Sequence, residues 1–214
     1  MCKVKSVIIA VFIIIPFILG AVVTVKPTGQ GGDYDCIQYA IDDIEDETIS
    51  EDEIHIYPSS GDYWEEDITI DDIDLTIVGI GDVSIKNRYE NTTLEYRSTN
   101  YHTFRLENLT IENDEDEFVI DIGGPGTGYY DEPDIEIEDC IFECTSGDAE
   151  GIVYIDKAKS IIIDGCIFLG SGSDCTVLNT HDAREISITN NEFSEESQTA
   201  IQARIPAPGG GRIL

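Results

Sequence analysis

Polar side chains that can hold a metal ion or move a proton follow three short apolar segments in the second half of the chain. The segments align on Ile152, Val177 and Ile201. This alignment places residues over one another in three pairs, which are Asp156 and His181, Lys157 and Asp182, and Thr180 and Arg204. On neighbouring strands such side chains would lie roughly 5–10 Å apart. An Asp, a His and an Arg at that spacing could bind calcium, abstract a proton or hold the carboxylate of a uronate.

This chemistry gives each side chain a role. The catalytic residues of the hypothesis, acting as base or substrate clamp, are His181, Lys157 and Arg204. The metal ligands, for calcium, are Asp156 and Asp182. The residues assigned to substrate binding are Tyr154, Thr180, Arg184 and Gln202. The alternative interpretation is that all of them occupy polar turns, where the basic side chains offset a local excess of acid.

An internal repeat indicates which elements position these residues. Residues 135–142, 161–168 and 186–193 align at steps of 26 and 25 residues, and a looser copy, 104–111, lies 31 residues before the first. Each unit alternates apolar and polar residues, which is the period of a half-buried strand, and none has a helical pattern. A unit of this size cannot bury its apolar face alone, so the repeats must stack as a parallel β-solenoid.

Stacking in register predicts two columns of equivalent side chains. The corner column contains Cys140, Cys166 and Asn191. The buried column is an aromatic stack of Phe142, Phe168 and Phe193. The strands expected between the repeats are 118–120, 151–155, 176–178 and 200–203.

The beginning of the chain supports the same architecture. Residues 24–42 combine a strand, a Gly-rich turn and the run Ile-Gln-Tyr-Ala-Ile-Asp, and a segment with a Gly-Asp-Tyr-Trp-Glu motif follows at 61–65. This pattern resembles the pectin-lyase-like superfamily, whose repeats occur in pectate lyases, pectinesterases and copper-site maturation proteins. The resemblance spans residues 22–205 and implies an all-β, right-handed parallel β-helix with a short N-terminal capping helix. The apolar face of that helix would consist of Ile37, Ala40, Ile41 and Ile44.

The resemblance also bears on function. In that superfamily, the strand before each repeat and its following turn line the substrate groove, which is where the candidate residues lie. The motifs of pectinesterases are missing, and residues 179–182 lack the Gly-His-Gly of polygalacturonases. We therefore expect a carbohydrate-binding or scaffold module whose partner is a polysaccharide or cell-surface glycan. The alternatives are a calcium-assisted polysaccharide lyase or related carbohydrate-active enzyme, and a purely architectural envelope protein.

Charge and the N-terminal segment constrain partners and location. The formal net charge of −32 disfavours nucleic acid as a partner. Residues 7–23 carry no polar side chain and follow two lysines, which predicts a signal peptide or a membrane anchor within residues 1–21 and an extracellular or cell-surface location. The predicted domain covers 22–205, and 206–214 form a tail rich in Pro and Gly. Because this tail does not resemble a cap, we expect a partner or a second copy to cover the C-terminal end.

Cysteine spacing argues against a metal site of the zinc type. The chain has six cysteines, and no CxxC pair occurs. Five remain after the leader, which is an odd number, so a closed disulfide framework is not expected. One disulfide is possible after export, but for most of these residues we predict a buried structural role.

Overall fold

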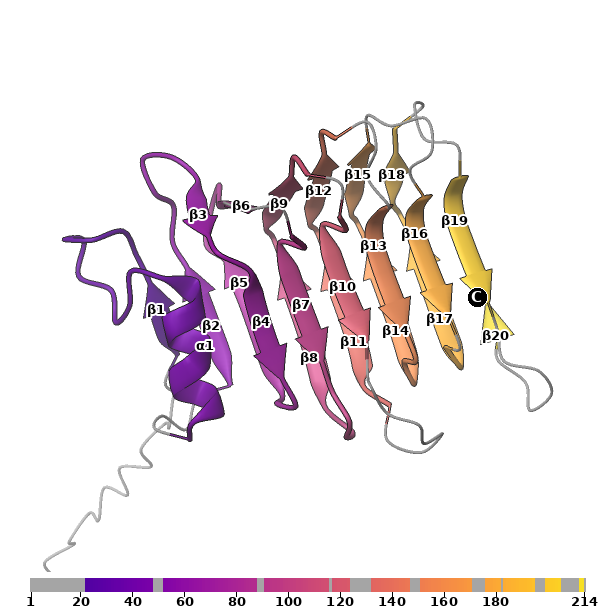
Figure 1. Cartoon of the computed structure of the whole chain (residues 1–214), viewed down its shortest axis with the longest axis horizontal. Helices are drawn as coiled ribbons and strands as arrows, with labels where there is room; N and C mark the ends of the chain where they lie inside the picture. Colours follow the sequence, from indigo (N-terminus) through magenta and orange to yellow (C-terminus); the bar gives the residue numbers. More distant parts are fainter. Residues whose placement is uncertain are drawn as a thin grey trace, which may run out of the picture.

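The computed structural model describes residues 22–47, 52–87, 91–115, 117–123, 132–146, 151–170, 176–181, 183–194, 199–204 and 212–213. Within these ranges the chain forms three parallel sheets that wind into a right-handed parallel β-helix (Figure 1). The predicted fold class is therefore confirmed. The coils advance along one axis from the N-terminal to the C-terminal end.

Each of the three sheets contains one strand from each successive coil, in chain order. Sheet A contains β1 (Val23–Val25), β2 (Glu53–Ile56), β5 (Leu75–Gly79), β8 (Thr103–Glu107), β11 (Asp134–Glu138), β14 (Ser160–Asp164), β17 (Glu185–Thr189) and β20 (Arg212–Ile213). Sheet B contains β3 (Tyr63–Glu65), β6 (Ser84–Asn87), β9 (Thr110–Asn113), β12 (Ile141–Cys144), β15 (Ile167–Gly170) and β18 (Glu192–Phe193). Sheet C contains β4 (Ile68–Asp71), β7 (Leu94–Arg97), β10 (Ile120–Gly123), β13 (Gly151–Asp156), β16 (Thr176–His181) and β19 (Thr199–Arg204).

Alternation of apolar and polar residues produces the core, because each strand turns every second side chain inward. One inward column of sheet A contains Leu75, Phe104, Ile135, Ile161 and Ile186. Each of these side chains is at most 1% exposed. Burying a side chain of this size contributes roughly 1.5–3 kcal/mol, so repetition along the axis supplies the stability that a single coil lacks.

The aromatic stack predicted from the repeat is confirmed. Ring centroids are 5.3 Å apart between Phe142 and Phe168 and 5.0 Å apart between Phe168 and Phe193. The corner column also forms, because Asn191 Oδ1 accepts a hydrogen bond from the backbone N–H of Cys166 (2.7 Å). Cys140 and Cys166 are buried there as free thiols.

The sharp corner between sheets A and B requires a left-handed backbone. The residues at that position in successive coils all have positive φ, between 52° and 68°, and they are Asn108, Asp139, Gly165 and Asn190. Gly, Asn and Asp are the residues that adopt this conformation at least cost. This explains why every repeat places one of them after its first strand.

A short helix covers the N-terminal end of the coils, as predicted. Helix α1 (Ile37–Glu45) packs against β1 and β4 (Figure 1). Its buried residues are Ile37, Ala40, Ile41 and Ile44. No helix in the described ranges is long and apolar enough to span a membrane. The predicted signal or anchor lies outside those ranges, so it stays a prediction.

Candidate functional site

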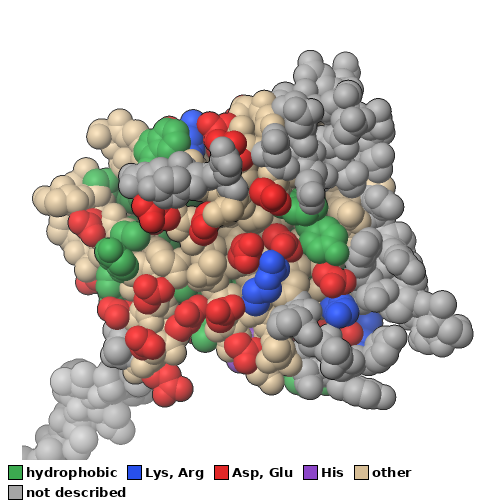
Figure 2. Space-filling view, in the orientation of Figure 1, with side chains coloured by type: hydrophobic (Ala, Val, Ile, Leu, Met, Phe, Trp, Pro, Cys, Tyr) green, Lys and Arg blue, Asp and Glu red, His purple; other side chains and the backbone are tan. Residues whose placement is uncertain are grey.

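Asp156 lies on the outer face of sheet C, the sheet whose strands carry most of the candidate residues predicted from the sequence. Asp156 of β13 pairs in register with His181 of β16, as the sequence alignment predicted, and His181 pairs with Arg204 of β19. The same column continues toward the N-terminus through Gly123 and Arg97. Figure 2 shows acidic side chains spread over the face viewed, with Lys and Arg at a few positions.

One predicted pairing is wrong by a single residue. The sequence alignment placed Thr180 over Arg204, but Thr180 pairs with Ala203 because Leu178, and not Val177, lies opposite Ile201. A shift of one residue exchanges the two faces of a strand. Thr180 accordingly points inward and is fully buried, whereas the register places Asp156, His181 and Arg204 in one column.

The remaining predicted residues lie in different surroundings. The Tyr154 ring lies against Phe118, with ring centroids 5.2 Å apart. Lys157 turns the chain after β13 with a φ of 59°. Arg184 Nε lies 3.0 Å from Glu132 Oε2. Asp182 lies outside the described residues, as do the side chains of His181, Gln202 and Arg204.

Sequence reasoning missed an ion pair on this face. Arg97 Nη2 lies 2.7 Å from Asp121 Oδ2 and 3.3 Å from Glu95 Oε2. The hydrogen bond to Asp121 raises the pKa of Arg97. Gly123 makes room for the guanidinium, because a Cβ there would lie 3.3 Å from Arg97 Nη1. The pair spans two adjacent coils, so only the register could have revealed it.

The part of the chain that the structure describes contains no cluster of ligands that supports calcium binding. No group of three or more His, Cys, Asp or Glu that could hold a metal ion occurs there. Calcium takes six to eight oxygen ligands, and one of the two predicted ligands, Asp182, lies outside the described ranges. Calcium binding by Asp156 and Asp182 therefore stays a prediction.

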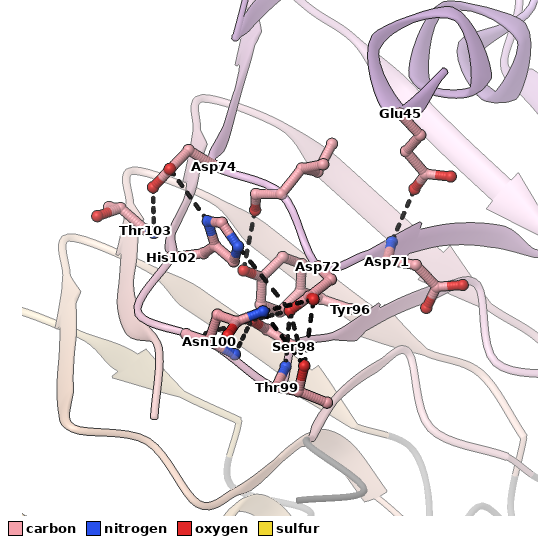
Figure 3. Close-up of polar contacts among 11 residues, drawn as sticks. Glu45, Asp71, Asp72, Asp74, Tyr96, Ser98, Thr99, Asn100, His102 and Thr103 are labelled. Carbon is pink, nitrogen blue, oxygen red and sulfur yellow. Dashed lines mark hydrogen bonds and ion pairs between the residues drawn. The ribbon is translucent and has the colours of Figure 1, made fainter. Parts of the chain in front are cut away.

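A second polar cluster lies in the turns that follow β4 and β7 (Figure 3). His102 Nδ1 lies 3.0 Å from Asp74 Oδ2, and its Nε2 lies 3.8 Å from Asp72 Oδ1. The Asp72 carboxylate accepts hydrogen bonds from Ser98, from the N–H and hydroxyl of Thr99, and from Asn100 Nδ2. Partial burial acts to raise the pKa of Asp72, but these hydrogen bonds outweigh it and the pKa lies below its ordinary value. The Asp72 carboxylate therefore fixes the turn of the next coil.

A cleft of about 640 Å³ lies between the N-terminal cap and β3. It is formed by the loop after β1, the start of α1 and the strand that carries the single Trp of the chain. Tyr39 and Trp64 line it and are 63% and 49% exposed. The carboxylates of Asp35, Asp62 and Glu66 line it as well. We call this site the aromatic cleft.

A buried carboxylate joins the start of α1 to β3, the two elements that carry Tyr39 and Trp64. Glu65 is 6% exposed, and its Oε1 accepts a hydrogen bond from the backbone N–H of Ile37 (3.1 Å). Its Oε2 accepts a hydrogen bond from the Cys36 thiol (3.1 Å). Burial, together with the neighbouring Glu65 carboxylate, raises the pKa of Cys36 to about 11. Glu65 therefore caps the first turn of α1 from β3 and fixes Tyr39 relative to Trp64.

Trp64 faces outward because of the alternation along β3. Tyr63 and Glu65 point inward, and Trp64 between them points to solvent. Lys86 Nζ lies 5.8 Å from the Trp64 ring centroid and 3.3 Å from Asp62 Oδ2, and it also forms an ion pair with Glu112. The sequence contains a signal for this exposed ring, because its single Trp falls between two inward-facing residues. The Gly-Asp-Tyr-Trp-Glu motif was interpreted only as evidence for the fold.

Comparisons of the chain with protein-family models, with curated proteins and with solved structures found no match. The class of protein is therefore defined by geometry, as a parallel β-helix with a helical N-terminal cap.

Proposed function

We propose that this protein binds carbohydrate through the aromatic cleft, as an exported or surface-anchored module of the pectin-lyase-like kind. The observation that carries the proposal is the pair of exposed rings, Tyr39 and Trp64, in a cleft that also presents carboxylates. An aromatic ring offers an apolar face to the C–H groups of a pyranose, and carboxylates accept hydrogen bonds from its hydroxyls.

A binding panel with two matched variants tests the proposal. The full chain is titrated with neutral, acidic and basic oligosaccharides, and the titrations are repeated with Trp64→Ala and Tyr101→Ala. Tyr101 is as exposed as Tyr39 but does not line the cleft. We expect Trp64→Ala to weaken binding about tenfold or more, since each 1.4 kcal/mol of binding free energy is tenfold, and Tyr101→Ala to leave it unchanged. Equal effects of both variants would refute this site.

The outer face of sheet C supports a second candidate function, a calcium-assisted polysaccharide lyase or related enzyme. Its support is the column that joins Asp156, His181 and Arg204 by strand register. In this hypothesis Asp156 and Asp182 hold calcium, and His181, Lys157 or Arg204 acts as base or clamp. Tyr154, Arg184 and Gln202 bind substrate, whereas Thr180, also predicted for this role, is fully buried and takes no part.

A product assay decides between binding and catalysis. The full chain is incubated with polysaccharides in calcium or in chelator, and new oligosaccharides are sought by mass spectrometry. Calcium-dependent unsaturated products that Asp156→Ala abolishes would support the lyase. The absence of any product would leave the binding function of the cleft as the proposal.

Exposed apolar surface at the far end supports a partner there. Ile201 on β19 pairs with the fully buried Leu178, yet it is 41% exposed. Lipids and nucleic acid do not suit so acidic a protein, so we propose that a second copy or a protein partner covers this end. A change of molecular mass in solution on Ile201→Asp would support an oligomer, and an unchanged monomer would argue against it.

A further inference from the structure

We infer that the aromatic cleft selects a positively charged sugar, namely an oligosaccharide of amino sugars with free ammonium groups. This inference rests on the proposed carbohydrate-binding function and specifies the class of its ligand. It is argued from the lining of the cleft, from an ammonium group that the same surface already holds, and from the charge of the whole chain.

The charged side chains of the lining are all acidic, and the neutral polar side chains of Thr28, Gln38 and Ser59 already donate hydrogen bonds within the protein. The side chains of Asp35, Asp62 and Glu66 come from two separate segments, and the described lining residues include no Lys, Arg or His. Neutral and anionic sugars need donors as well as acceptors, because their hydroxyl or carboxylate oxygens must be satisfied. An ionised carboxylate only accepts, so this lining suits a ligand that donates hydrogen bonds and carries positive charge.

An ammonium group of the protein itself occupies the edge of this surface. Lys86 Nζ lies near the Trp64 ring and 3.3 Å from Asp62 Oδ2. The attraction between an ammonium group and the face of an aromatic ring is strongest for Trp. The charge of Lys86 is compensated by Asp62 and Glu112, so it does not oppose a second cation in the cleft, and the lining carboxylates that act on that cation are Asp35 and Glu66. The combination of ring and carboxylate is the chemistry that recognises an ammonium group.

Long-range charge acts in the same direction. The net charge of −32 attracts a cationic ligand and repels a polyuronate before either reaches the cleft. This general attraction would also draw a cation to other acidic surfaces, so the test must separate the cleft from the rest of the molecule.

The experiment compares oligosaccharides that differ in charge. The full chain is titrated calorimetrically with the hexamer of β-1,4-linked glucosamine, with its fully N-acetylated counterpart and with oligogalacturonate. The protein variants are Asp35→Asn with Glu66→Gln, and a control with the same charge change outside the cleft, Asp114→Asn with Asp82→Asn. Both control residues are exposed and do not line the cleft. Amide side chains keep the size of the carboxylates, and both variant pairs make the same exchange of a charged acceptor for a neutral amide, so the comparison isolates the position of the change.

We expect the glucosamine hexamer to bind at least tenfold more tightly than its N-acetylated counterpart. This advantage should fall to less than threefold in Asp35→Asn with Glu66→Gln and persist in the control. Equal or tighter binding of the neutral or acidic sugar would overturn the inference while leaving the proposed function intact. Equal losses in both variant pairs would also overturn it, because the attraction would then be general. Binding of none of the sugars would overturn the inference and the proposed function together.

Discussion

Glu65→Ala should loosen the N-terminal cap without disturbing the rest of the β-helix. The substitution removes both acceptors that Glu65 presents to the start of α1, namely those for the Ile37 N–H and the Cys36 thiol. It leaves β3 able to pair with β6 through its backbone, since only a side chain changes. The expected loss is therefore local to residues 36–45.

The magnitude follows from the contacts. Loss of an N-terminal cap costs about 1 kcal/mol, and a donor left buried without a partner costs about 1–3 kcal/mol. Removing a carboxylate that is only 6% exposed also relieves the cost of burying its charge, which offsets part of the loss. We expect a net destabilisation of α1 of about 2 kcal/mol. Glu65→Gln keeps an oxygen for the Ile37 N–H and should cost roughly 0.5–1 kcal/mol.

Amide hydrogen exchange resolves this effect by segment. A loss of 2 kcal/mol corresponds to about 30-fold faster exchange in α1, and β14 to β17 should be unchanged. The glycan affinity of the aromatic cleft should fall as well, because Tyr39 is no longer fixed relative to Trp64. Exchange in α1 within twofold of the parent protein would refute the role of Glu65. Equal acceleration in β14 to β17 would show that the effect is not local.

Three further predictions concern the coils. Phe168→Ala should destabilise the protein by about 3–5 kcal/mol in urea unfolding, and Phe193→Ala by less, because Phe168 is fully buried and stacked on both sides; equal losses would contradict the stack. Asp72→Asn should cost roughly 1 kcal/mol at neutral pH, because the carboxylate is partly exposed. The pKa of Asp72 is lower in the folded than in the unfolded chain. The difference in stability between the parent protein and Asp72→Asn is therefore fully present above the unfolded pKa and is lost as the pH falls through the folded pKa. A difference that persists in acid would contradict the assignment. Gly79→Ala should lower the thermal midpoint, because its Cβ would lie 2.0 Å from the backbone oxygen of Asn108, and a midpoint equal to that of the parent protein would show that the corner can relax.

The sequence predicted the coils well where each repeat carries marker residues at fixed positions. A turn residue with positive φ, a Cys or Asn and a Phe recur at fixed phase, so residues 104, 135, 161 and 186 align in sheet A as predicted. Side-chain ladders of this kind leave a strong period in the sequence because each coil repeats the same environment. The capping helix was equally visible, since its apolar residues follow helical spacing.

Sheet C was harder to predict because its strands lack such markers. The segments before the repeats share only short apolar runs, so the register of β19 was wrong by one residue. Strand β7 was not anticipated, and with it the pairing of Arg97 and Asp121 was missed. The aromatic cleft was missed for another reason, since it joins the N-terminal loop and helix to β3, outside any repeat.

The most direct test of carbohydrate binding at the cleft uses the fluorescence of Trp64. Because the chain has a single Trp, its emission reports on the cleft alone. The full chain is titrated with the oligosaccharide that binds most tightly in calorimetry, and the emission is recorded with and without acrylamide as a quencher. The account predicts a saturable change of emission, with the same affinity as calorimetry, and protection of Trp64 from quenching. Calorimetric binding with unchanged emission and unchanged quenching would place the ligand elsewhere and contradict the account.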